Sequence, residues 1–328
     1  MKRALAGALA GLVGWWAVGT TRALRRVPPE LRTPRLLVSS AWMPLAVLPR
    51  LRAGMRQDTP VPPGVAVTER DADGVPVLLY EGGSRPVPSG ALLWIHGGGH
   101  LVGHPGMDHA LAGRIAAETG VLVVSVDYRL APEDPFPADL DDCSGALRWL
   151  QDHADDLGVD PARIAVGGAS AGGGLAAATV NRAHDEGRPV AFALLEYPML
   201  DDRTALARVP GGRGRFVWNA RMNRRAWTAY VGSPAGAPGV PEGAAPARRR
   251  DLAGLPPTWI GVGDQDLFHD EDVSYAGRLR AAGVPVELHV EPGMYHGADA
   301  LVPDAPSVQA FRGRMVAAVR AAVGEAGQ

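Results

Sequence analysis

Hydrophobic residues in this chain gather into short continuous runs, each bounded by polar or glycine-rich stretches. A short continuous apolar run predicts a strand that is buried on both faces, as in a parallel sheet. The predicted strands are Val65–Val67, Val75–Tyr80, Ala91–Ile95, Val121–Val126, Arg163–Gly167, Ala191–Glu196, Pro257–Val262 and Val284–Val290. The turn at Asp73-Gly74 predicts that the first two of them form a hairpin.

Helical periodicity fills most of the intervals between these strands. The predicted helices are Asp108–Thr119, Ala138–His153, an alanine-rich stretch that runs through Asn181, Asp270–Ala282 and Ser307–Val323. Strands that alternate with helices indicate a mostly parallel sheet with helices on both faces. The sequence therefore predicts an α/β fold around a sheet of roughly eight strands.

Two regions depart from this alternation. Residues 1–62 contain two apolar stretches, and the second of them, Arg35–Gly54, is interrupted by prolines. From about residue 200 to 250 no strand pattern is present. We therefore predict an N-terminal apolar segment and part of a cap in residues 1–62. Residues 63–328 are then the main domain, with a cap insertion at about 200–250.

The insertion contains four aromatic residues, namely Phe216, Trp218, Trp227 and Tyr230. They either line a pocket or pack the insertion onto the sheet, and the sequence leaves both roles open. The arginine triplet Arg248–Arg250 predicts an exposed basic face.

The stretch Ala4–Thr21 carries no charge and follows a basic start. Its length is just sufficient to span a membrane, but its alanine and glycine content makes it only weakly hydrophobic. A helix that packs on the domain and a membrane anchor are therefore both open. We expect a cytoplasmic protein, with membrane association through residues 4–21 as the alternative. A homodimer is also left open.

The composition of the 328 residues excludes several classes of protein. A net charge of −2 argues against nucleic-acid binding, which usually requires a basic face. The single cysteine, Cys143, excludes an internal disulfide and a cysteine-rich metal site, and we expect it to be buried. No metal or organic cofactor is expected.

The segment Gly168–Gly172 has the spacing G-x-S-x-G directly after a predicted strand and before a predicted helix. This pattern is typical of a nucleophilic serine on a tight strand-to-helix turn. The turn brings its flanking positions so close to neighbouring segments that only glycine fits there. Ser170 is therefore the candidate nucleophile.

A second glycine-rich motif, His96-Gly97-Gly98-Gly99, follows the predicted strand that ends at Ile95. Consecutive glycines after a strand allow backbone amides to point into a cavity, where they can hold an oxyanion. We assign the oxyanion hole to the amides of Gly98 and Gly99, with the amide of Ala171 as the third donor. His96 is expected to be structural.

A serine nucleophile needs a histidine base and an acid that orients it, and in this type of fold both follow the serine in the sequence. His296 lies in a loop after the last predicted strand, whereas His184 lies on a helix and His289 within a strand. The preceding loop offers Asp264, Asp266 and Asp270 as the acid. Asp270 fits the N-cap of the next helix. Asp266 is preferred over Asp264 partly because of its position in the loop and partly because of the family resemblance described next.

Together these motifs, with Asp127–Glu133 between them, resemble the bacterial hormone-sensitive lipase-like (family IV) esterases of the α/β-hydrolase fold. The resemblance covers the chain from about Val65 onward. It implies a serine carboxylesterase for short- to medium-chain acyl esters, with the triad Ser170, Asp266 and His296 and a helical cap. Three positions depart from the family pattern, and they are Ala169, His100 and Ala298.

The same residues leave other functions open. A site of this kind also serves an amidase, a lactonase or an acyltransferase. A non-catalytic ligand receptor on the same fold is a further alternative, although receptors of that type typically lack the catalytic histidine. The expected partner is a small-molecule ester.

Overall fold

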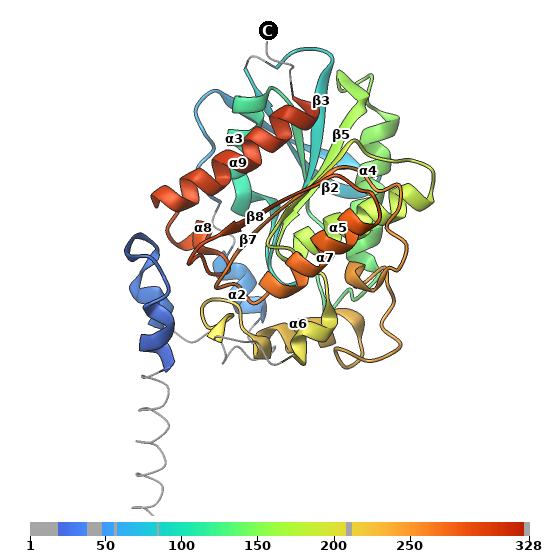
Figure 1. The fold of residues 1–328 in the computed structure, drawn as a ribbon. Helices are drawn as coiled ribbons and strands as arrows, with labels where there is room; N and C mark the ends of the chain where they lie inside the picture. The colour runs from blue at the N-terminus through green and yellow to red at the C-terminus, as the bar shows by residue number, and fades with distance from the viewer. Residues whose placement is uncertain (1–18, 38–47, 56–57, 84, 208–211, 325–328) are drawn as a thin grey trace, which may run out of the picture.

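A mixed sheet of eight strands forms the centre of the computed structural model (Figure 1). The model describes residues 19–37, 48–55, 58–83, 85–207 and 212–324. The strands are β1 (Val65–Ala72), β2 (Val75–Gly82), β3 (Ser89–Ile95), β4 (Leu122–Val126), β5 (Val159–Ala169), β6 (Phe192–Glu196), β7 (Thr258–Gly263) and β8 (Val286–Glu291). All eight predicted strands are present, so the predicted fold class is confirmed.

The strand order is β1-β2-β4-β3-β5-β6-β7-β8. The strands β1 and β2 form the expected antiparallel hairpin, and β2 also pairs antiparallel with β4. All other pairs are parallel. The carboxyl ends of the parallel strands therefore meet at one edge of the sheet, where ligand sites of α/β proteins lie.

Helices cover both faces of the sheet (Figure 1). Two of them, α3 (His109–Thr119) and α9 (Pro306–Val323), share one hydrophobic cluster with the sheet, around Trp94 and Trp259. The opposite face packs against α4 (Ala138–Asp152), α5 (Ala171–Asp185) and α7 (His269–Ala281). The central strand β3 is buried along its whole length between these layers, as its continuous apolar run predicts. Cys143 in α4 is buried, as expected.

The remaining helical elements are short, and most lie in the two regions that break the alternation. They are η1 (Pro29–Leu31), η2 (Pro34–Leu37), α2 (Leu48–Met55), η5 (Pro105–Asp108), η6 (Asp202–Ala205), α6 (Ala220–Val231), η8 (Pro246–Arg248) and α8 (Ala298–Leu301). Between residues 200 and 250 the described residues contain no strand, as expected. Helices α2 and α6 contribute to the same hydrophobic cluster, through Leu48 and Trp227.

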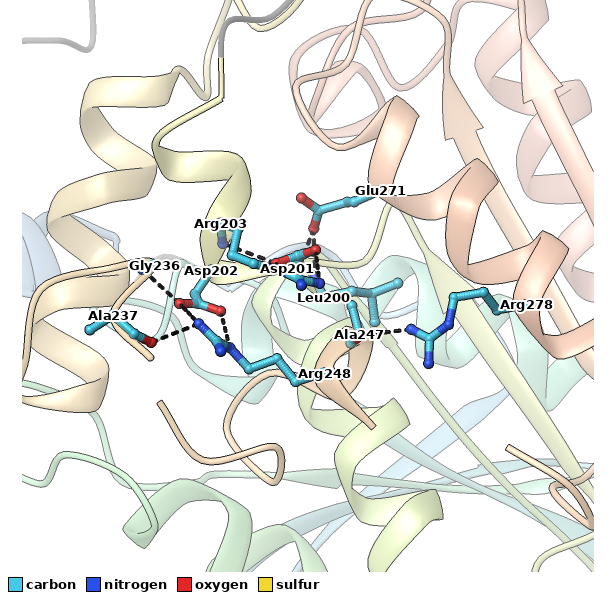
Figure 2. A network of polar contacts seen from close by, with 10 residues as sticks. All are labelled: Leu200, Asp201, Asp202, Arg203, Gly236, Ala237, Ala247, Arg248, Glu271 and Arg278. Atoms are coloured by element: carbon cyan, nitrogen blue, oxygen red, sulfur yellow. Dashed lines mark hydrogen bonds and ion pairs between the residues drawn. The ribbon is translucent and has the colours of Figure 1, made fainter. Parts of the chain in front are cut away.

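Polar contacts hold both ends of this insertion together (Figure 2). Arg248 donates two hydrogen bonds to the carboxylate of Asp202, over 2.7 and 2.9 Å, and Asp202 is fully buried. Glu271 of α7 accepts the amide of Leu200 at 2.7 Å, and Arg278 donates to the carbonyl of Ala247 at 2.6 Å. The insertion is therefore anchored to α7 at its beginning and at its end.

The expectation of an exposed basic face at Arg248–Arg250 is wrong for its first two residues. The side chain of Arg248 is only 16% exposed because it neutralises Asp202, and that of Arg249 is 14% exposed because it pairs with Asp185. Both partners lie more than forty residues away in sequence. Local charge pattern alone does not reveal such pairs.

No helix among the described residues is long and apolar enough to cross a membrane. Most of the stretch Ala4–Thr21 lies outside those residues. The division at residue 62, the cytoplasmic location, the alternative of membrane association and the homodimer stay predictions.

The ion pair between Arg248 and Asp202 yields a stability prediction. Arg248→Gln leaves a buried carboxylate without its counter-charge, and we expect unfolding free energy to fall by about 3–5 kcal/mol. Arg203→Gln is the matched control, because Arg203 is 54% exposed in its pair with Asp201, and it should cost at most about 1 kcal/mol. Urea denaturation measures both. Equal losses would contradict the anchoring role.

Candidate active site

Ser170 occupies a strained turn between β5 and α5. Its backbone angles are φ 56° and ψ −119°, a conformation that non-glycine residues rarely adopt. A side chain at Gly168 would overlap the carbonyl oxygen of Gly172, and one at Gly172 would overlap the carbonyl oxygens of Ile95 and His96. The two glycines therefore permit the close approach that the sequence pattern predicts.

A continuous chain of hydrogen bonds connects the three predicted triad residues. Ser170 Oγ lies 2.9 Å from His296 Nε2, and His296 Nδ1 lies 2.8 Å from Asp266 Oδ2. Since a carboxylate only accepts hydrogen bonds, Nδ1 carries the proton and Nε2 is free to accept the serine hydroxyl. The other oxygen of Asp266 accepts the amide of Phe268 at 2.9 Å, which fixes the carboxylate.

Asp266 is the candidate acid that the structure brings to His296. Asp264 instead accepts the amide of Gly293 at 2.7 Å. The expectation that Asp270 caps the next helix is wrong, because α7 begins one residue earlier and no side chain caps it. Asp270 pairs instead with Arg213 and His269.

Two further carboxyls, those of Glu271 and Asp272, are buried in the first turn of α7. Burial raises the pKa of Asp272 well above its usual value, and the charges of Glu271 and Asp266 raise it further. Burial likewise raises the pKa of Glu271 well above its usual value. Burial therefore disfavours the charged form of both side chains.

The glycine motif lies directly beside the serine. A side chain at Gly97 would approach Ser170 Cβ to 3.4 Å, and Gly98 and Gly99 have φ values of 132° and 63°. Within the described part of the chain, no group accepts a hydrogen bond from the amides of Gly98, Gly99 or Ala171. The three amides are therefore available to an external acceptor.

The two histidines that flank the three glycines, His96 and His100, have structural contacts. His96 is buried and stacks on Tyr128 with ring centroids 4.2 Å apart. Burial lowers the pKa of His96 to about 4, so its ring is neutral at neutral pH. His100, also buried, lies 2.8 Å from Asp139 through Nδ1 and stacks on Tyr230 at 3.7 Å. The predicted structural role of His96 agrees with these contacts.

Aromatic side chains surround His296. Its ring meets those of Tyr197, Phe268 and Trp218 at centroid distances of 4.7, 5.2 and 6.2 Å. Trp218 also lies so close to Gly99 that a side chain there would overlap its indole. Of the four aromatic residues in the insertion, Trp218 is thus the one at the site.

The other three aromatic residues of the insertion, Phe216, Trp227 and Tyr230, are buried and belong to hydrophobic clusters. The contact of Tyr197 with His296 was not predicted from the sequence, and the position of Tyr197 directly after a predicted strand is the signal that could have indicated it. His100, which departs from the family pattern, contacts Asp139 and Tyr230.

Within the described ranges, no group of three or more His, Cys, Asp or Glu side chains is arranged to hold a metal ion. The arrangement that the site does offer is a hydroxyl, a base and an acid in hydrogen-bonded order, beside unoccupied amides. Such an arrangement can perform nucleophilic acyl transfer.

Comparison with known proteins agrees with this chemistry. Residues 92–300 match the family described as alpha/beta hydrolase fold. The chain is 40% identical over 247 residues to the carboxylesterase NlhH of Mycobacterium tuberculosis, which covers 71% of this chain and 73% of that protein.

Two solved structures are similar over nearly their whole length. A bacterial heroin esterase has a TM-score of 0.84 at 38% identity, over 92% of this chain and 99% of the other. An esterase from the bacterial hormone-sensitive lipase family has a TM-score of 0.72 at 27% identity, over 93% of this chain and 98% of the other.

The tight approach at Gly172 yields a second prediction. We expect Gly172→Ala to lower unfolding free energy by at least about 1–3 kcal/mol, because the new methyl group overlaps backbone oxygens that cannot move independently. Gly277→Ala is the control, since a side chain at this helical position meets no atom within 4 Å. It should raise stability by about 0.5–1 kcal/mol. Denaturant unfolding measures both free energies. An unfolding free energy of Gly172→Ala equal to that of wild type would contradict the steric explanation.

Proposed function

Since the chain belongs to the α/β-hydrolase family and to its hormone-sensitive lipase-like esterases, it is a carboxylic ester hydrolase, and we propose that Ser170 is its nucleophile. His296 is then the general base, and Asp266 holds it in the required tautomer. The amides of Gly98, Gly99 and Ala171 form the oxyanion hole. We further propose short- to medium-chain acyl esters as substrates.

The hydrogen-bonded order of Ser170, His296 and Asp266 is the observation that carries this proposal. All three residues are at most 6% exposed, so bulk water competes little for their contacts. In such a setting the direction of each hydrogen bond is fixed before a substrate arrives. The strained Ser170 backbone supports the proposal, because strain of this kind clusters at functional sites.

In the acylation step, Ser170 Oγ attacks the ester carbonyl carbon while its proton passes to His296 Nε2. The carbonyl oxygen becomes an oxyanion, and the free amides beside Ser170 are suited to accept it. Loss of one such donor typically costs about 3–4 kcal/mol of barrier. The alcohol then departs with the proton from Nε2, which leaves an acyl-enzyme.

Deacylation uses the same groups in reverse. A water molecule gives a proton to His296 Nε2 and attacks the acyl carbonyl carbon. The bond to Ser170 Oγ then breaks, and the proton returns to the serine as the carboxylic acid leaves. The carboxylate of Asp266 stabilises the imidazolium that forms in each half-reaction.

We propose that helix α2 and residues 200–250 form a cap beside this site. Arg52 of α2 supports the proposal, since it donates to the carbonyls of Leu101 and Ala131 at 2.8 and 2.7 Å. Those hydrogen bonds connect α2 to the loop that follows the oxyanion glycines and to the loop between β4 and α4. The position of Trp218 supports the proposal of short acyl groups, because its indole narrows the space between Gly99 and His296.

Hydrolysis of p-nitrophenyl esters from acetyl to dodecanoyl tests the proposed activity. We expect the highest kcat/KM at short acyl lengths, because the indole of Trp218 narrows the space beside Gly99 and His296. Ser170→Ala should abolish turnover, since it removes the attacking oxygen. Folded wild-type protein with no more activity than Ser170→Ala at any length would favour a receptor. Transfer of the acyl group to an added alcohol would instead favour an acyltransferase.

A pair of aspartate variants tests the acid. We expect Asp266→Asn to lower kcat by about 10³–10⁴-fold, because an amide no longer favours the required tautomer of His296. Asp264→Asn is the matched control. It retains the oxygen that accepts the amide of Gly293, so its kcat should stay within about twofold of wild type. Steady-state kinetics with one ester measures both, and the reverse ranking would assign the acid to Asp264.

A further inference from the structure

Tyr197 is connected to the nucleophile through the backbone. It directly follows β6, and its φ of 34° is unusual for an aromatic residue. Its amide donates to the carbonyl of Gly261 at 2.7 Å, and the carbonyl of the preceding Glu196 accepts the amide of Ser170 at 2.8 Å. The peptide unit between Glu196 and Tyr197 is thus held on one side to β7 and on the other to the turn that contains Ser170.

The ring of Tyr197 packs edge-to-face against the imidazole of His296. The centroids are 4.7 Å apart and the planes are inclined by 64°. Contacts of this geometry favour one ring orientation over others. A shift of the tyrosine ring would therefore change the position of His296 Nε2 relative to Ser170.

The phenol of Tyr197 is fixed in turn by a buried ion pair. Its hydroxyl donates to Asp299 Oδ1 at 2.7 Å, and Arg312 of α9 donates to Asp299 Oδ2 at 2.9 Å. Asp299 lies three residues beyond His296, at the beginning of α8. Tyr197 therefore touches both ends of one short segment, with its ring at His296 and its hydroxyl at Asp299.

The electrostatics of this cluster keep the phenol in the donor state. Burial, with the charges of Asp299 and Glu196, raises the pKa of Tyr197 well above its usual value. Burial and the charge of Asp299 also raise the pKa of Glu196 well above its usual value. Asp299 therefore accepts from the phenol of Tyr197 through one carboxylate oxygen and from Arg312 through the other.

We propose that Tyr197 is a positioning residue that holds the imidazole of His296 toward Ser170, and that the pair of Asp299 and Arg312 fixes Tyr197 in that role. The inference rests on the proposed function, because it assigns His296 as the base. A positioning role of Tyr197 differs from a purely structural role in one measurable respect. Loosening Tyr197 should impair the chemical step before it impairs substrate binding or folding.

Tyr197→Phe tests this inference, since it removes the hydroxyl and keeps the ring and the backbone geometry. We expect kcat for p-nitrophenyl acetate to fall about tenfold, because small displacements of a reacting group are costly. KM should stay within about twofold. Tyr197→Leu, which also removes the ring contact, should lower kcat further. A kcat of Tyr197→Phe within twofold of wild type would overturn the proposal.

Tyr80→Phe is the matched control. Tyr80 is fully buried, and its hydroxyl lies 2.9 Å from His109 Nδ1, outside the site. Both Phe variants should lose similar thermal stability, but only Tyr197→Phe should lose kcat. Equal loss of kcat in both would show a general effect of stability and would contradict positioning.

Asp299→Ala gives a second variant. It removes the oxygen that accepts the Tyr197 hydroxyl, and we expect kcat to fall as it does in Tyr197→Phe. Because both changes act through one hydrogen bond, the double variant should be no slower than the slower single variant. Additive losses would overturn the proposed connection.

A readout without turnover separates this inference from the proposed function. The Nδ1 proton between His296 and Asp266 is expected to give a low-field proton NMR signal, which Asp266→Asn should remove. Tyr197→Phe should broaden it through faster exchange with water, whereas Tyr80→Phe should not. Wild-type protein without Ser170-dependent hydrolysis would contradict the proposed function, and the NMR comparison would still decide the role of Tyr197. An unchanged signal in Tyr197→Phe would contradict the positioning role of Tyr197.

Discussion

The close approach of three backbone segments at Ser170 is the constraint on which the site depends. The turn after β5 lies against the carbonyls of Ile95 and His96, so no side chain fits at Gly172. This contact puts the glycine motif beside the serine, and within the described ranges the amides of Gly98, Gly99 and Ala171 have no hydrogen-bond acceptor. The strain at Ser170 is maintained because the buried central strands on each side of β5 leave the turn no room to relax.

The parallel sheet brings the remaining groups to the same place. Asp266 and His296 lie in loops after β7 and β8, so the sheet alone brings them to the edge where Ser170 lies. Side-chain contacts then set the geometry. Phe268 supplies the amide that orients Asp266, and aromatic rings surround the imidazole. On α7, which follows Asp266 directly, Glu271 and Arg278 also anchor the insertion.

Much of this arrangement could be predicted from sequence because the signals are local. Apolar segments predicted all eight strands, although β1 and β8 at the edges of the sheet are not buried on both faces. The spacing around Ser170 predicted its turn. The errors concern contacts between distant segments. The partner of Arg248 lies 46 residues away, so the triplet was interpreted as exposed. The role of Tyr197 depends on Asp299, which is 102 residues away, and no local pattern connects them. Asp270 was misassigned because the start of a helix is uncertain by one or two residues.

In the proposed mechanism Ser170 carries the acyl group during turnover. Intact-protein mass spectrometry of an acid-quenched reaction with a slowly hydrolysed p-nitrophenyl ester, followed by peptide mapping, tests this role. We expect one acyl group per chain, on the peptide that contains Ser170, and none in His296→Ala under the same conditions. Release of p-nitrophenol without any adduct, or an adduct on a different residue, would contradict it.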